Sequence, residues 1–125
     1  MAFSAFIDDG YTEQGHIAEA ERLHPAIDFT FRPLTAVEWL KCLHECDGLK
    51  LNELRPVEAR WLAAHVQKWS LRDCAGNIVP INVSTMQKLK PALFGKLFGI
   101  VSGQKAGDSP PANQSSSDPT ADAKN

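Results

Sequence analysis

The side chains with the most obvious capacity for chemistry are three cysteines and one histidine. Cys42 and Cys46 lie four residues apart, while His65 and Cys74 lie further along the chain. Three thiolates and one imidazole form a ligand set that suits structural zinc. Structural zinc ligands usually come as short pairs near turns, however, and free cysteine is among the most buried residue types. Because Cys42 and Cys46 fall on an apolar helical stripe, we expect them to pack in the core without a metal.

Cys74 is the thiol most open to reaction, because it falls in a predicted turn. A nucleophilic thiol needs a base within hydrogen-bonding distance, and the sequence does not assign one to Cys74. The chain has no Gly-rich phosphate loop, no G-x-S-x-G and no H-E-x-x-H motif. With four histidines, chance pairs with carboxylates are expected in any fold. We therefore expect a protein that is not an enzyme.

The three tryptophans, Trp39, Trp61 and Trp69, suggest a ligand platform or a base-stacking surface. Each of them falls on or beside an apolar stripe. Large aromatic side chains supply buried area that a small domain otherwise lacks. We therefore expect the tryptophans to lie in the core or at its rim.

Composition limits the class of protein. The chain has 125 residues, 43% hydrophobic and 22% charged, with a formal net charge of -2, which is typical of one small domain. A protein that grips phosphate backbones is usually strongly basic, so we expect no nucleic-acid partner. The apolar stretch at residues 92–101 is too short to cross a bilayer, and residues 1–10 lack the basic start of a secretion signal. Three cysteines without framework spacing suit reduced thiols, so a cytoplasmic location is expected.

Hydrophobic periodicity predicts an α+β fold with three to four helices and a two- or three-stranded antiparallel sheet. A strand is expected at residues 26–32, where apolar and polar side chains alternate, and a helix at 36–46, where Thr35 and Glu38 form a capping box. A second helix is expected at 56–68, followed by a β-hairpin whose turn contains residues 73–77. Asn82 is expected to cap a third helix, which Pro91 interrupts before a short final helix.

The pattern divides the chain into three parts. Residues 1–23 give no firm pattern, although residues 17–23 suit a short helix. Residues 24–103 form the predicted domain. Residues 104–125 contain three prolines and no large apolar side chain, so we expect a disordered polar tail.

The final helix carries more large apolar side chains than one stripe of a short helix needs to bury. An amphipathic helix that docks on a partner uses anchors at such i, i+3 and i+4 spacings. The alternative is that both sides of the helix pack within the domain. On the first interpretation, the expected partner-binding residues are Leu93, Phe94, Leu97, Phe98, Ile100 and Val101.

Several segments together resemble a known class of protein. The segments are Phe31-Arg32-Pro33-Leu34-Thr35, the helix from Trp61 toward Trp69, the stretch from Gly76 to Asn82, and the run from Leu89 to Ile100. Over residues 26–103 the chain resembles the small tail assembly chaperones and related tail-region proteins of tailed bacteriophages and prophages. Neither residues 1–23 nor the polar tail takes part in this similarity.

The resemblance implies a function as well as a class. It implies a non-enzymatic protein in the cytoplasm of a bacterial host, without a cofactor, that holds a tape measure protein or tail tube protein during tail assembly. Two alternatives stay open: a structural tail or head-tail component that is retained in the particle, and a small thiol- or zinc-dependent protein. Self-association is a further expectation that the sequence leaves open.

Overall fold

The computed structural model describes residues 6–8 and 10–109. In this part of the chain, four helices and a three-stranded antiparallel sheet confirm the predicted α+β class. The strands are paired in the order β1-β2-β3. The elements are β1 (Glu13–Ile17), β2 (Ile27–Phe31), α1 (Ala36–Cys46), α2 (Leu51–His65), β3 (Val66–Trp69), α3 (Val83–Gln87) and α4 (Pro91–Val101).

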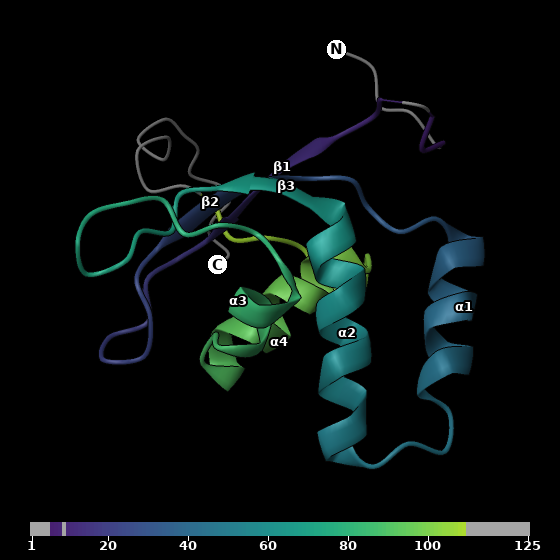
Figure 1. Ribbon diagram of the computed structural model, residues 1–125. Coiled ribbons are helices and arrows are strands. Elements are labelled where there is room, and N and C mark those ends of the chain that lie inside the picture. Colours follow the sequence, from purple (N-terminus) through teal and green to yellow (C-terminus); the bar gives the residue numbers. More distant parts are fainter. Residues whose placement is uncertain (1–5, 9, 110–125) are drawn as a thin grey trace, which may run out of the picture.

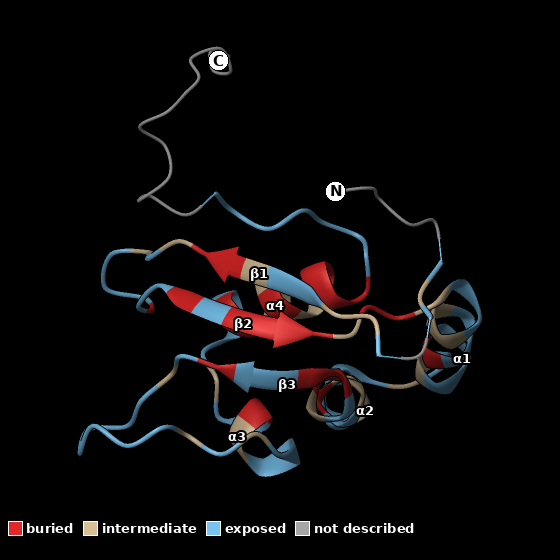
Figure 2. Cartoon of the chain, turned by 90° about the horizontal axis from the view of Figure 1, so that it is seen from above, coloured by how far each residue is buried: buried red, intermediate tan, exposed pale blue. Residues whose placement is uncertain are grey.

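The helices α2, α3 and α4 lie on one side of the sheet, and α1 stands beside α2 at the margin of the molecule (Figure 1). Figure 2 looks onto the opposite face of the sheet, with α4 behind the strands. The core fills the space between the sheet and these helices. Its fully buried side chains include Ile17, Ile27, Leu62, Met86, Leu97 and Val101.

The central strand β2 follows in part the alternating pattern that predicted it. Ile27, Phe29 and Phe31 are buried and Asp28 is exposed, but Thr30, a polar position of the pattern, is buried as well. Phe29 is paired with Trp69 of β3 and with Gly15 of β1. Alternation places the three apolar side chains on the face that the helices cover.

The third strand comes from the segment that the sequence left without a firm pattern. Strand β1 pairs with β2 from Glu13↔Phe31 to Ile17↔Ile27. Residues 17–23 therefore do not form a helix: β1 ends at Ile17, and two backbone hydrogen bonds between Ala20 and His24 close a turn. The domain thus begins before residue 24. Residues 1–5 and 9 lie outside the described part of the chain.

Helix α1 has the predicted bounds and the predicted cap. The amide of Glu38 donates to Thr35 Oγ1 at 3.1 Å, and the amide of Thr35 donates to Glu38 Oε1 at 2.9 Å. This reciprocal capping box satisfies two amide groups at the helix start that otherwise lack partners.

Helix α2 differs from its prediction at both ends. It begins at Leu51, because the Glu53 carboxylate accepts from the amide of Lys50 at 2.9 Å and starts the helix ahead of Pro56. It ends at His65, because residues 66–69 pair with β2 and form β3. Pairing with a buried strand outweighs the helical propensity of a few residues.

The predicted hairpin near residues 69–81 is wrong in one respect. The turn is present, with the amide of Asp73 donating to Asn77 O at 2.9 Å, but among the described residues its arms form one isolated bridge, Arg72↔Ile78, and not a pair of strands. The third strand of the sheet is therefore β1 rather than a hairpin arm. Asn82 caps α3 as expected, whereas Pro91 is the first residue of α4 and does not interrupt a helix.

The predicted tail boundary at residue 104 also changes. The amide of Asp108 donates to His16 O at 2.8 Å, and Asp108 Oδ2 accepts from the amide of Ala18 at 2.8 Å. Residues up to 109 therefore belong to the described fold, next to β1, and residues 110–125 lie outside it. Within the described part, no helix is long and apolar enough to serve as a membrane-spanning segment.

Two glycines in different environments provide a test of this packing. A Cβ atom at Gly15 would lie 2.4 Å from the Phe29 ring, whereas a Cβ at Gly95 in α4 would meet nothing within 4 Å. We expect Gly15→Ala to lower the free energy of unfolding by about 1–3 kcal/mol through overpacking. Gly95→Ala should raise it by up to about 1 kcal/mol, because alanine favours helix. Urea unfolding measures both, and equal effects would contradict the packing.

Candidate functional site

Helix α4 is the place where the sequence predicted a partner-binding surface, and it is buried. Leu93, Phe94, Leu97, Ile100 and Val101 are at most 9% exposed. Phe98 is half-buried, and its ring centroid lies 6.2 Å from that of Trp39. The expectation that these six residues form a docking surface is therefore corrected. Their side chains pack within the domain, as the alternative interpretation stated.

Contacts along its apolar stripe explain why α4 carries so many large apolar side chains. It packs against β1 and α2, and its last residue Val101 accepts a hydrogen bond from the amide of Leu34 at 3.1 Å. The Arg55 guanidinium lies 4.9 Å from the centroid of the Phe94 ring. The side that carries Gly95 is open, since an added Cβ there would meet nothing within 4 Å.

The exposed apolar side chains gather on α1 instead. Val37, Leu40 and Leu43 are 63%, 65% and 46% exposed, and they recur every three residues. Val37 and Leu40 line a shallow depression of about 330 Å³ together with the polar residues Lys41, His44 and Glu45. We call Val37, Leu40 and Leu43 the outer apolar face of α1. Sequence reasoning missed this face because it assigned all apolar residues of α1 to one stripe.

The opposite side of α1 faces the domain. Cys42 is buried, and Trp39 and Cys46 pack against the core. Helix α1 contacts chiefly α2, so the side away from α2 has no covering element among the described residues. The helix therefore has apolar side chains on two sides, one buried and one open to solvent.

Two of the three cysteines, Cys42 and Cys46, pack with the core. All three are free, with Cys42 buried, Cys46 half-buried and Cys74 exposed. Burial raises the pKa of the Cys42 thiol to about 12, with a smaller contribution from the neighbouring Cys46. The described residues contain no group of three or more His, Cys, Asp or Glu side chains that could hold a metal ion. Cys42 and Cys46 therefore contribute to packing, as their position on the apolar stripe predicted.

His65, the imidazole considered for zinc, has other contacts. Its Nδ1 lies 2.7 Å from the carbonyl oxygen of Arg32, and its ring stacks on that of Trp61. This contact joins the end of α2 to the residue that follows β2. It is a structural role for a buried histidine.

The tryptophans lie in the core or at its rim, as predicted. Trp69 is buried, and its Nε1 donates to Val79 O at 2.7 Å. Trp61 is half-buried, and its Nε1 donates to Glu45 Oε1 at 2.8 Å. This hydrogen bond and a second one from Arg60 lower the pKa of the Glu45 carboxyl.

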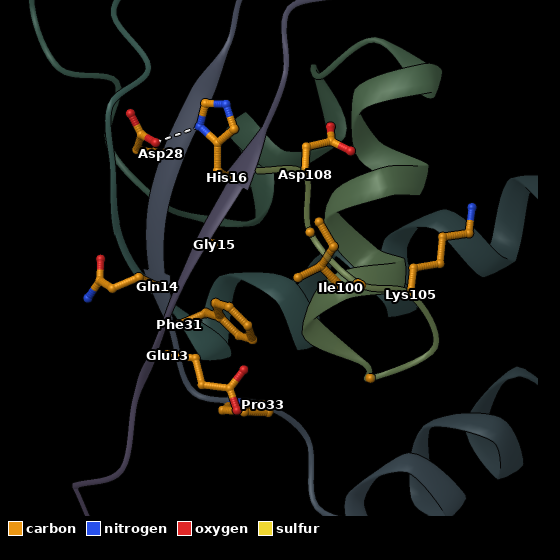
Figure 3. A pocket seen from close by; sticks show the side chains of 13 residues that line it. Glu13, Gln14, Gly15, His16, Asp28, Phe31, Pro33, Ile100, Lys105 and Asp108 are labelled. Atoms are coloured by element: carbon orange, nitrogen blue, oxygen red, sulfur yellow. Dashed lines mark hydrogen bonds and ion pairs between the residues drawn. The ribbon is translucent and has the colours of Figure 1, made fainter. Parts of the chain in front are cut away.

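A larger cavity lies beside the edge strand β1. It has a volume of about 610 Å³ and is bounded by β1, Phe31, Ile100 and residues 103–108. At one end of it, His16 Nδ1 lies 2.7 Å from Asp28 Oδ1 (Figure 3). The described lining residues include no serine, threonine or cysteine, but Ser70 Oγ accepts a hydrogen bond from the amide of Asp28 at 2.9 Å, so one hydroxyl lies near this histidine-carboxylate pair. The sequence offered only weak alternation around His16 as a signal.

Comparison with family models, curated proteins and solved structures found no match for this chain. The functional argument therefore depends on the surfaces themselves. Of these surfaces, the outer apolar face of α1 is the one whose exposure to water is least favourable.

A pair of leucines tests the division between core and exposed face. Leu97 is fully buried in α4, whereas Leu40 is 65% exposed on α1. We expect Leu97→Ala to lower the free energy of unfolding by about 2–5 kcal/mol, because it leaves a cavity. The same change at Leu40 should alter it by about 0.5 kcal/mol or less. Urea denaturation measures both values, and a large cost at Leu40 would mean that this face is covered.

Thiol chemistry tests the cysteine environments. In the folded protein at pH 8, Cys74 should react with a disulfide reagent within minutes, and Cys42 only on unfolding. Because the Cys42 pKa rises from 9.0 to about 12 on folding, its stabilising contribution is complete below pH 9 and is lost as the pH rises toward 12. Labelling kinetics of the unchanged chain and of Cys74→Ser measure the reaction rate of each thiol. Equal rates for all three thiols would contradict it.

Proposed function

We propose that this chain is a non-enzymatic tail assembly chaperone or adaptor that acts in the cytoplasm of a bacterial host. It holds a helical partner protein on the outer apolar face of α1. The observation that carries the proposal is the cluster of Val37, Leu40 and Leu43, exposed on a helix whose other side is already buried. The resemblance of residues 26–103 to phage tail assembly chaperones supports the class of function.

The spacing of the outer apolar face favours a helix as its occupant. Side chains three residues apart form a ridge along a helix, and such ridges pack into the grooves of a second helix. The depression of about 330 Å³ between Leu40 and the polar side chains of α1 can accept an anchor from that helix. Apolar surface with a polar rim is the usual anatomy of a protein-protein contact.

The charges at the rim favour a partner with acidic side chains. Glu45 is engaged by Arg60 at 2.9 Å and by Trp61, so its charge is largely compensated. Lys41 beside it is exposed and makes no side-chain hydrogen bond or ion pair within the described part of the chain. The partner helix is therefore expected to place a carboxylate next to its apolar stripe. Electrostatic complementarity of this kind selects partners and speeds association.

The size of the face limits how strongly it can hold a partner by itself. Its three side chains are already partly buried, so covering them fully contributes on the order of 1 kcal/mol each. Association itself costs at least about 4 kcal/mol in lost translational and rotational freedom. The three side chains alone therefore do not give net binding, and the contact has to include groups at the rim of the face such as Lys41. A chaperone has to release its partner, and a long helical tape measure protein offers several segments that can be held in turn.

Charged substitutions on α1 test the proposal. We expect Val37→Asp combined with Leu40→Asp to weaken binding to the tape measure protein encoded nearby at least tenfold. The reason is that a carboxylate would have to lose its water at the contact. Lys41→Glu should weaken binding as well, because it would repel an acidic partner. Calorimetry or co-elution with the purified partner measures these effects, and circular dichroism checks that each variant is folded.

The matched control is Ile78→Asp. Ile78 is 48% exposed, close to the exposure of Leu43, but it lies in the loop after β3 rather than on α1. This variant should bind the partner with the affinity of the unchanged chain. Retained binding by the folded Val37→Asp, Leu40→Asp variant would overturn the proposed surface, and equal loss in the Ile78 variant would show that the effect is not specific to α1.

A further inference from the structure

A second pocket lies on another part of the molecule. It has a volume of about 590 Å³ and lies between the turn that joins β1 to β2 and the segment that joins α3 to α4. Both connections lie at the same side of the ribbon in Figure 1. Three of the lining residues, Arg22, Lys88 and Lys90, are cationic, and Glu19 is the one acidic residue among them. The pocket is therefore basic in a chain whose formal net charge is -2.

The cations of this pocket are not neutralised by the fold. Within the described residues, neither Arg22, Lys88 nor Lys90 makes a side-chain hydrogen bond or an ion pair. Arg22 is the one arginine of five for which this holds. The other four, Arg32, Arg55, Arg60 and Arg72, donate to a carboxylate or to a backbone carbonyl. Three like charges around one cavity repel each other unless an anion joins them.

The backbone around Arg22 keeps that residue in the pocket lining. Hydrogen bonds of 3.1 Å in both directions between Ala20 and His24 close the turn. Arg22 lies at its centre with φ of 66°, and it is the one non-glycine residue of the described chain with positive φ. This conformation costs on the order of 1 kcal/mol or more for a residue with a side chain. Glycine would adopt it without strain, so arginine carries a local cost at this position.

Two further groups at the pocket lack partners. Lys90 is the N-cap residue of α4, no side chain caps this helix, and Pro91 follows as the first helical residue. The positive end of the α4 dipole therefore lies next to Lys90, although no residue of α4 itself lines the pocket. His24 is 7% exposed and lines the pocket. Its buried Nε2 has no hydrogen-bond partner within the described chain, and its Nδ1 lies 2.9 Å from Pro25 O, so the neutral ring offers the anion no donor there.

We infer that this pocket binds a multiply charged oxyanion of the phosphate class. The guanidinium of Arg22 can donate two parallel hydrogen bonds to one phosphate, while the ammonium groups of Lys88 and Lys90 supply point charges. An anion of two charges offsets the net positive charge of three cations and Glu19. A helix N-terminus favours the same kind of ligand. The site is separate from the outer apolar face of α1 and does not depend on the proposed function.

Titration of the full chain with inorganic phosphate tests this inference. The backbone amide resonances of residues 19–24 and of Lys88, Leu89, Lys90, Ala92 and Leu93 should shift with saturation, at an ionic strength held constant with sodium chloride. Lys88→Gln combined with Lys90→Gln should weaken the apparent affinity at least tenfold. Arg22→Gly should weaken it as well without loss of stability, because glycine relieves the strained φ. Circular dichroism of each variant confirms that it is folded.

The control removes the same charge elsewhere. Lys41→Gln combined with Lys68→Gln, both exposed and outside the pocket, should leave phosphate affinity within twofold of the unchanged chain. Acetate, with one charge, should produce smaller shifts in the same residues. Shifts spread over the whole chain, equal shifts with acetate, or unchanged affinity in the Lys88→Gln, Lys90→Gln variant would each overturn the inference. None of these measurements involves a protein partner, so the result is independent of the test on α1.

Discussion

The enclosure of α4 is the constraint on which the rest of the structure depends. This helix carries a wide stripe of large apolar side chains, and Leu97 and Val101 are fully buried. Such a stripe is stable only when other elements cover it. The sheet covers one side, and α1 and α2 cover others (Figure 1). The polar contacts around it, such as the amide of Leu34 bonded to Val101 O, fix its position relative to the chain that follows β2.

Because the apolar side chains of α4 are buried in the core, the exposed apolar side chains gather on α1, at the margin of the molecule. Helix α1 contributes Cys42 and Trp39 to the interior and still carries Val37 and Leu40 on its outer side. A single exposed leucine needs no explanation, but three aliphatic side chains along one exposed face form an apolar patch, and the proposed partner contact depends on this patch. The basic pocket beside Arg22 is the electrostatic counterpart of this face. Its three cationic side chains have no hydrogen-bond or ion-pair partner within the described residues. Both surfaces lie on rigid elements or tight turns, which suits recognition of a partner or ligand without large rearrangement.

Parts of the fold could be read from local sequence because the deciding interactions are local. The capping box of Thr35 and Glu38 and the cap at Asn82 involve residues three positions apart, and both were predictable. The alternation in β2 was equally clear. Helix α2 and β3 were not, because the switch from helix to strand at residues 65–66 follows from pairing with β2 and not from the residues themselves. Strand β1 forms for the same reason, since its sequence barely alternates and it is pairing with β2, the next strand, that makes it a strand.

The amino-acid sequence determined the α+β class, the strongly apolar character of α4 and the placing of Cys42, Cys46 and the tryptophans in the core or at its rim. It could not decide which apolar side chains face outward, because a helix face buried by its own domain and one offered to a partner have the same periodicity. Tertiary structure decided this by placing α4 inside and leaving one side of α1 uncovered. It also brought Arg22 beside Lys88 and Lys90, which are more than sixty residues away in the chain. Charge and burial depend on neighbours in space, and only the folded chain supplies those neighbours.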